Sequence, residues 1–128
     1  MQVRALDYIG ITVSDLDLAL TFYRDVLGLS VEFLEREWGY AELALPPTTI
    51  ALSVLSPDAP AELRAPFGGA ISVAVAVPDV AAALAEVRER GVPVLLDTVD
   101  GSWCEQALIA DPDGNRILLH HRKDGTAG

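Results

Sequence analysis

The sequence contains one structural plan twice, and this internal repeat limits the possible folds more than any other feature. Each copy has an alternating apolar stretch, an Asp that can start a helix, a Gly that can end it, and a Trp in a later turn. Equivalent positions are 64, 63 and 65 residues apart, and such a nearly constant offset indicates a duplicated supersecondary unit. The matched positions are Asp15 and Asp79, Gly28 and Gly91, and Trp38 and Trp103.

Each copy is expected to form a strand, a helix and three further strands, because its apolar residues recur at the spacing of a strand or of a helix in that order. The first copy predicts strands over 4–13, 30–36, 40–45 and 48–55, with a helix that Ser14 or Asp15 caps and Gly28 ends. The second copy predicts strands over 70–77, 92–98, 103–110 and 116–121, a helix from Asp79 to Gly91, and a turn over 99–102.

The predicted fold class is α+β, with two tandem βαβββ modules that form a concave mixed sheet bearing a cleft. A chain of 128 residues is expected to be a single domain, with a first module over about 4–55 and a second over about 70–121. Residues 56–69 read as the connection, because they hold three prolines and two glycines. One short helical turn is expected there, over 61–65.

Composition excludes two classes of partner. The net charge is −10, with 19 acidic and 9 basic residues, and this lacks the basic stripe that nucleic-acid binding needs. No run approaches the roughly 18–20 apolar residues of a membrane helix, and the start lacks the apolar core of a signal peptide. We therefore expect a cytoplasmic protein, and the single Cys104 agrees with a reducing compartment. The acidic surface favours cationic ligands, or serves solubility alone.

Two stretches, YIGITVSDLDLALTFYRDVLGL (8–29) and DPDGNRILLH (111–120), carry a family resemblance. Together with the paired βαβββ plan, they resemble the vicinal oxygen chelate superfamily, which includes glyoxalase I, extradiol dioxygenases, and fosfomycin and bleomycin resistance proteins. The resemblance implies a cleft lined by the sheet of both halves. It also implies a homodimer, with clefts completed within one chain or across the interface.

The resemblance further implies where metal-dependent members hold a divalent ion, through two His and a Glu. The corresponding positions here are Tyr8, Ser72 and Leu118, none of which is a good ligand for a divalent metal. His120 and His121 are neighbours on one predicted strand, so they point to opposite faces and cannot share an ion. We therefore predict no metal and no cofactor. His120 either faces the cleft or is an ordinary histidine near the surface.

The predicted ligand site is the cleft itself. The first strands present small or hydroxyl-bearing residues to it, which leaves room for a flat ligand or lets the half-sheets approach closely. Trp38 and Trp103 can stack on an aromatic or cationic molecule, or cover the core edge or a dimer seam. The candidate ligand-binding residues are Tyr8, Trp38, Tyr40, Ser72, Trp103, Glu105, Leu118 and His120.

These observations favour a metal-independent protein that binds an antibiotic or another natural product, an aromatic or cationic small molecule, and confers resistance by sequestration. The alternative is a glyoxalase- or dioxygenase-type enzyme, acting as a lyase, isomerase or oxygenase with an atypical or absent metal site. A regulatory module without a small ligand is a third possibility. No catalytic residue is assigned, because no histidine can be placed beside Cys104 as a base.

Overall fold

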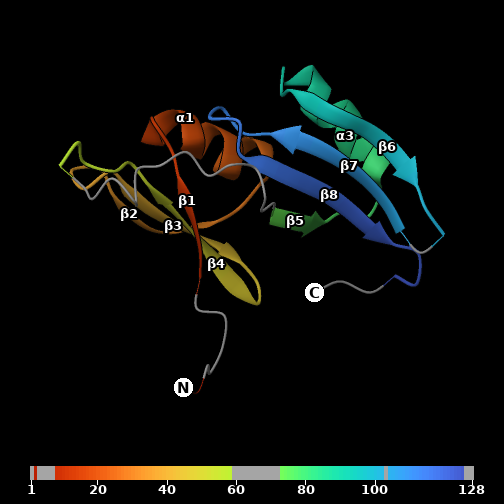
Figure 1. Ribbon diagram of the computed structural model, residues 1–128, viewed down its shortest axis with the longest axis horizontal. Helices are drawn as coiled ribbons and strands as arrows, with labels where there is room; N and C mark the ends of the chain where they lie inside the picture. The colour runs from red at the N-terminus through yellow and green to blue at the C-terminus, as the bar shows by residue number, and fades with distance from the viewer. Residues whose placement is uncertain (1, 3–7, 59–72, 103, 126–128) are drawn as a thin grey trace. The chain divides into compact units, whose positions relative to one another are not determined.

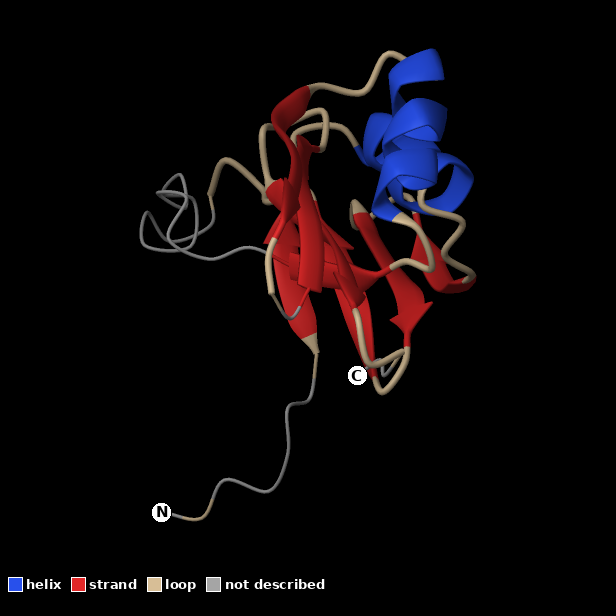
Figure 2. Cartoon of the chain, turned by 90° about the vertical axis from the view of Figure 1, so that its right-hand side faces the viewer, coloured by secondary structure: helices blue, strands red, loops and turns tan. Residues whose placement is uncertain are grey.

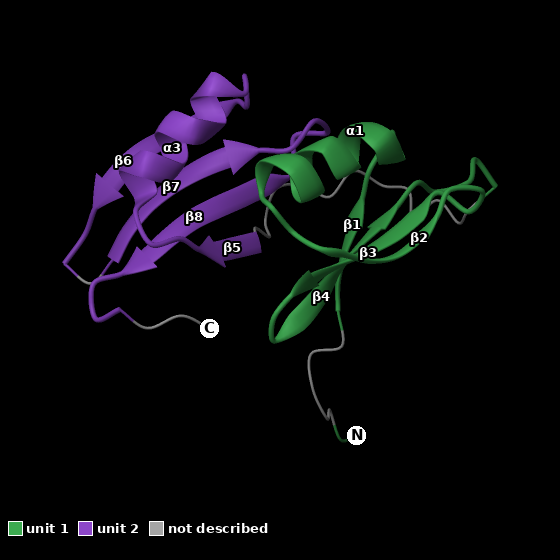
Figure 3. Cartoon of the chain, turned by 180° about the vertical axis from the view of Figure 1, so that it is seen from behind, with its two compact units in different colours: residues 1–66 green, residues 67–128 purple. Residues whose placement is uncertain are grey.

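The computed structural model describes residue 2 and residues 8–58, 73–102 and 104–125. The predicted helical turn over 61–65 and two candidate site residues, Ser72 and Trp103, lie outside the described residues. The chain divides into two compact units, Met1–Pro66 and Phe67–Gly128 (Figure 3). The division falls within the proline- and glycine-containing stretch 56–69.

Unit 1 contains a four-stranded mixed sheet and one helical segment (Figure 1). Strand order across the sheet is β1-β4-β3-β2, with β1 parallel to β4 and the other pairs antiparallel. Its elements in chain order are β1 (Ile9–Thr12), α1 (Leu16–Leu20), the π-helical η1 (Thr21–Val26), β2 (Val31–Glu35), β3 (Tyr40–Leu45) and β4 (Thr48–Ser53).

Unit 2 repeats this topology, with strand order β5-β8-β7-β6 and β5 parallel to β8. Its elements are β5 (Val73–Ala76), α3 (Val80–Glu89), β6 (Val94–Asp100), β7 (Cys104–Ala110) and β8 (Arg116–Arg122). The predicted α+β class with two tandem βαβββ modules is therefore confirmed, as two four-stranded mixed sheets. None of the helices in the described ranges is both long and apolar enough to cross a membrane.

Equivalent aspartates start both helices. The Asp15 carboxylate accepts a hydrogen bond from the Leu18 backbone N–H at 3.0 Å, and the Asp79 carboxylate accepts one from Ala82 at 2.9 Å. Such N-caps stabilise a helix by about 1 kcal/mol. Of the two predicted caps of the first helix, the structure selects Asp15.

The two helices differ by one residue, and a π-turn accommodates the difference. The Leu27 N–H donates to the Phe22 carbonyl, five residues back, at 2.9 Å. At the end of the first helix, Leu29 donates to Tyr23, six residues back, whereas at the end of α3 Val92 donates to Val87, five residues back. A single-residue insertion in a helix is commonly absorbed in this way. It explains why the repeat offset falls from 64 at the helix start to 63 at the closing glycine.

The core of each unit lies between the helix and one face of the sheet (Figure 2). Side chains alternate along a strand, so this face takes every second strand residue and the other face takes the rest. In unit 1 the buried apolar residues of this core are Ile11, Val13, Leu16, Ala19, Leu20, Phe22, Tyr23, Ala41, Leu43, Ile50 and Leu52, and Ala51 is buried on the other face of the sheet. In unit 2 they are Val73, Val75, Val80, Leu84, Val87, Ala107, Ile109, Ala110, Ile117 and Leu119.

The predicted turn over 99–102 is wrong in its first half, because β6 continues to Asp100. Val99 pairs with Gln106 and Asp100 with Glu105 in the antiparallel ladder. The Asp100 carboxylate also forms an ion pair with Lys123 at 2.5 Å. The chain turns only at Gly101, whose N–H donates to the Cys104 carbonyl at 2.9 Å.

Candidate functional site

Strand register places an aromatic and acidic set of residues on the open face of unit 1, opposite the helix. Residues paired across neighbouring strands share a face. One row across this face is Gly10, Ala51, Glu42 and Phe33, and the next row is Thr12, Ser53, Tyr40 and Glu35. We call the group formed by Tyr8, Phe33, Tyr40 and Glu42 the aromatic face.

Tyr40 connects the other members of the aromatic face. Its hydroxyl donates a hydrogen bond of 2.6 Å to Glu42 Oε1, two residues further along β3. Its ring centroid lies 6.0 Å from that of Phe33, with the ring planes tilted by 58°. The hydrogen bond and the ring contact together hold three side chains from β2 and β3 in a defined arrangement.

The electrostatics of this pair are asymmetric. The hydrogen bond to Glu42 raises the pKa of Tyr40 to about 12, with desolvation and the charge of Glu42 acting in the same direction. Tyr40 therefore remains a neutral phenol at neutral pH. The negative charge of the aromatic face resides on the Glu42 carboxylate.

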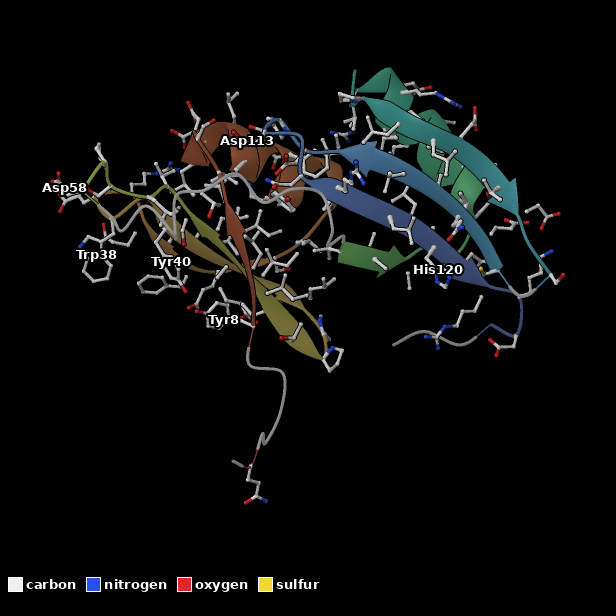
Figure 4. All side chains as sticks on the ribbon, viewed as in Figure 1. Tyr8, Trp38, Tyr40, Asp58, Asp113 and His120 are labelled. Carbon is white, nitrogen blue, oxygen red and sulfur yellow. The ribbon has the colours of Figure 1, made fainter. Side chains whose placement is uncertain are left out.

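Tyr8 extends the aromatic face to β1. It is 57% exposed, and a Cβ added to Gly10 would lie 3.4 Å from Tyr8 Cε2, so the ring lies over this glycine. Tyr8 also contributes to the raised pKa of Tyr40, which places the two phenols within electrostatic range of each other. Figure 4 shows Tyr8, Tyr40 and Trp38 along the same side of unit 1.

Trp38 occupies the hairpin between β2 and β3 and is 71% exposed. The backbone beneath it is held in place: Gly39 donates to the Arg36 carbonyl at 3.1 Å, and Val54 donates to the Gly39 carbonyl at 2.7 Å. An ion pair between Arg36 and Asp17 links the hairpin to the first helix. A large apolar ring is thus exposed to solvent on a well-ordered turn, which suits a contact residue.

The open face of unit 2 has a different character. His120 is in register with Ala76 and Gln106, and Leu118 with Ala74 and Leu108. Leu118 and His120 are therefore on one face, as their spacing predicts, and both are half-buried. This face is mainly aliphatic, whereas that of unit 1 is aromatic and acidic.

Glu105 does not share the face of His120. It pairs with His121 across β7 and β8, and the ring nitrogen Nδ1 of His121 lies 3.1 Å from the Val77 carbonyl oxygen. Because side chains alternate along a strand, Glu105 lies on the side opposite Gln106 and His120. We therefore remove Glu105 from the candidate site.

Sequence reasoning missed Phe33 as a site residue. Phe33 lies two residues before Glu35 in the predicted strand 30–36, and this spacing places the two side chains on the same face of the strand. That spacing was the sequence pattern that could have identified Phe33. The contact with Tyr40 depends on how β2 pairs with β3, because the register shifts between Val31 and Phe33.

The residues at the metal positions of related enzymes do not fit a divalent ion. Leu118 offers no donor atom, and the Tyr8 phenol is not among the His, Cys, Asp and Glu side chains that such ions usually bind. Over the ranges 8–58, 73–102 and 104–125, no three His, Cys, Asp or Glu side chains come together as a metal site. Ser72 lies outside these ranges.

A family model described as Glyoxalase/Bleomycin resistance protein/Dioxygenase superfamily matches residues 5–119. Among solved structures, TnmS3, an antibiotic binding protein from Streptomyces sp. CB03234, is 26% identical with a TM-score of 0.74, over 96% of this chain and 99% of that one. A glyoxalase/bleomycin resistance protein/dioxygenase from Nocardioides is 20% identical with a TM-score of 0.75, over 100% and 90% of the two chains. No curated protein matches the sequence.

Proposed function

Since the chain belongs to the glyoxalase/bleomycin resistance protein/dioxygenase superfamily, also called the vicinal oxygen chelate superfamily, we propose that it is a metal-independent small-molecule-binding protein. Its ligand is an antibiotic or another natural product, and it confers resistance by sequestration. One observation carries this proposal. The metal positions of related enzymes hold Tyr8 and Leu118, and Tyr8 belongs to an ordered aromatic face.

The likeness to TnmS3 supports an antibiotic as the ligand. That protein is described as an antibiotic binding protein, and the two chains match over nearly their full lengths. Sequestration needs only stoichiometric binding, because a protein that holds the free drug concentration below its inhibitory level protects the cell without turnover. The aromatic face supplies apolar contact area for such binding, and its few polar groups supply orientation.

The Tyr40–Glu42 pair favours binding over acid–base catalysis. A general base works best when its carboxylate is available and its pKa lies near the working pH. Here one oxygen of Glu42 already accepts a hydrogen bond of 2.6 Å from Tyr40, so it is less available to take a proton from a substrate. The raised pKa of Tyr40 likewise makes this phenol a poor proton donor at neutral pH.

We further propose that the protein is a cytoplasmic homodimer. Two exposed apolar side chains of β6, Leu96 and Val99, share the open face of unit 2, and Leu95 of the same strand is exposed as well. A cluster of this kind on an edge strand is typical of a surface that another chain covers. Sedimentation equilibrium tests the assembly, and a monomeric mass over the whole concentration range contradicts it.

The binding proposal is tested with protein that has been treated with a chelator and dialysed. Aromatic antibiotics are titrated against it while tryptophan emission and the heat of binding are followed. We expect saturable binding with a stoichiometry of one ligand per site and no change when Zn²⁺, Ni²⁺, Mn²⁺ or Fe²⁺ is added. Expression of the protein should also raise the inhibitory concentration of the bound drug.

A ligand that binds only after metal is restored, or that the protein converts to a product, would contradict the proposal and favour the enzyme. Elemental analysis of protein purified without chelator is the complementary measurement. Stoichiometric transition metal in that preparation would likewise contradict metal independence.

A further inference from the structure

The duplicated fold provides an internal comparison that shows what is particular to unit 1. Strand register makes Glu42 of unit 1 equivalent to Leu108 of unit 2. In unit 1, Glu42 pairs with Ala51, and Ala51 pairs with Gly10 of the first strand. In unit 2, Leu108 pairs with Leu118, and Leu118 pairs with Ala74 of the first strand. By the same pairing, Phe33 is equivalent to Leu96 and Tyr40 to Gln106. Two aromatic rings and a carboxylate in unit 1 thus replace two leucines and a glutamine in unit 2.

We propose that the aromatic face binds the cationic end of a planar aromatic ligand, with Glu42 as the counter-ion and Phe33, Tyr40 and Tyr8 as stacking and cation–π partners. This inference rests on the proposed binding function and specifies its ligand class. The ligand is an amine, amidine or guanidine attached to, or part of, a flat ring system.

The charges of unit 1 support a cation. On the open face, the charged side chains among the described residues are Glu35 and Glu42, and both are acidic. Glu35 already accepts a hydrogen bond from the Glu37 backbone N–H at 3.1 Å. The described arginines of this unit pair with carboxylates elsewhere, Arg24 with Asp25 and Arg36 with Asp17. An anionic ligand would therefore meet repulsion on this face.

The geometry of Glu42 supports the same assignment. Across the described ranges, Tyr40 is the one recorded hydrogen-bond partner of its carboxylate, so the second oxygen remains available to a ligand. The bond from Tyr40 fixes the carboxylate beside two aromatic rings. A cation held there gains both a charge-assisted hydrogen bond and attraction to the ring faces. Tyr40 therefore acts as a positioning residue for Glu42 as well as a stacking partner.

The test uses two planar probes of nearly the same shape, at about pH 8: 9-aminoacridine, which is a cation, and acridine, which is neutral. We expect the wild-type protein to bind the cation at least about tenfold more tightly than the neutral probe. Glu42→Gln should remove most of this preference and leave the affinity for acridine unchanged within about twofold. Amide chemical shifts should move for the residues of the aromatic face.

Two control variants isolate the effect of position. Glu86→Gln removes the same charge from the exposed surface of α3, so it should keep the preference for the cation. Leu108→Ala alters the equivalent position of unit 2 and should keep it as well. Tyr40→Phe frees Glu42 from its hydrogen bond, and we expect it to reduce the preference without abolishing it. Circular dichroism and thermal melting establish that each variant is folded.

The outcomes separate this inference from the proposed function. Equal affinity of the wild-type protein for the two probes, or the same loss with Glu86→Gln as with Glu42→Gln, would overturn the cation site while leaving the binding function intact. Binding of neither probe would also overturn the cation site. Failure of the antibiotic titrations described above would overturn both.

Discussion

The Tyr40 hydroxyl donates a 2.6 Å hydrogen bond to Glu42, two residues further along β3 on the same face of the sheet. This bond joins the polar and the aromatic parts of the open face of unit 1. It keeps the Tyr40 phenol neutral and orients the Glu42 carboxylate, and the Phe33 ring lies beside Tyr40. A face of this kind is pre-organised for a ligand, because its side chains need little reordering on binding.

The first prediction concerns the titration of Tyr40. Because the pKa of Tyr40 is raised to about 12, a late component should appear when the tyrosinate absorbance of the three tyrosines is followed with pH. Tyr40→Phe should remove that late component, and Glu42→Gln should move it back towards the ordinary value near 10. A late component that persists in Tyr40→Phe would contradict the assignment to Tyr40.

The same shift makes stability depend on pH with a defined sign. The folded protein holds the Tyr40 proton more tightly than the unfolded chain does, so the contribution is complete below about pH 10 and is lost as the pH rises towards 12. The wild-type protein should therefore lose stability more steeply than Glu42→Gln over this interval. Urea unfolding at several pH values measures the difference.

The second prediction concerns Gly39, which positions Trp38. Its φ is 63°, and an added Cβ would lie 2.9 Å from the Val54 Cβ. Gly39→Ala should therefore lower the free energy of unfolding by about 2–4 kcal/mol, from left-handed strain and the clash together. Gly28→Ala is the matched control, because its φ is 74° with no atom within 4 Å, and it should cost only about 1–2 kcal/mol. Equal losses would show that the contact with Val54 relaxes freely.

Sequence patterns predicted the fold well because each element is bounded by local chemistry. The strand expected over 40–45 is β3 itself, since Gly39 turns the chain before it and Pro46 ends it. Both helices start at an aspartate whose carboxylate accepts a hydrogen bond from the backbone N–H three residues further on. The single residue that separates the helix lengths was visible as the change of offset from 64 to 63, although its conformation was not.

The candidate site was less predictable, because it depends on register between strands. Alternation along one strand predicts which of its side chains share a face, and the predicted shared face of Leu118 and His120 is confirmed. Phe33 meets Tyr40 only after an irregularity in the pairing of β2 with β3, which no local pattern reveals. Glu105 was assigned to the site from its place near a hairpin, and only its pairing with His121 shows that it faces the other way. For all the candidate residues a role in ligand binding stays a prediction, and Ser72 and Trp103 lie outside the described residues.

The third prediction concerns Asp111, the one buried charged residue among those described. Its carboxylate accepts hydrogen bonds from the backbone of Asp113 at 2.9 Å and of Asn115 at 2.7 Å, and from the Asn115 side-chain amide at 2.8 Å. Asp111→Ala should cost about 2–4 kcal/mol, because it leaves these donors without their acceptor. Asp113→Ala, on the exposed side of the same turn, should cost less than about 1 kcal/mol. Comparable losses would contradict the central role of Asp111 in this turn.

The final prediction tests the origin of the π-turn. If η1 holds one inserted residue, then deleting Asp25 should convert the segment to an ordinary α-helix with the spacing of α3. Asp25 is exposed and forms an ion pair with its exposed neighbour Arg24 at 2.7 Å, and such surface pairs contribute less than about 1 kcal/mol. We expect the free energy of unfolding to change by no more than about 1 kcal/mol.

Deleting Glu86 from α3 is the matched control for this prediction. That helix has no extra residue, so the deletion turns the buried Val87 by about 100° relative to Val80 and Leu84. The loss of its apolar contacts should cost about 2–4 kcal/mol. Chemical denaturation of the two deletion variants measures both effects. If removing Asp25 proves as costly as removing Glu86, the π-turn is a required part of unit 1 and not an accommodated insertion.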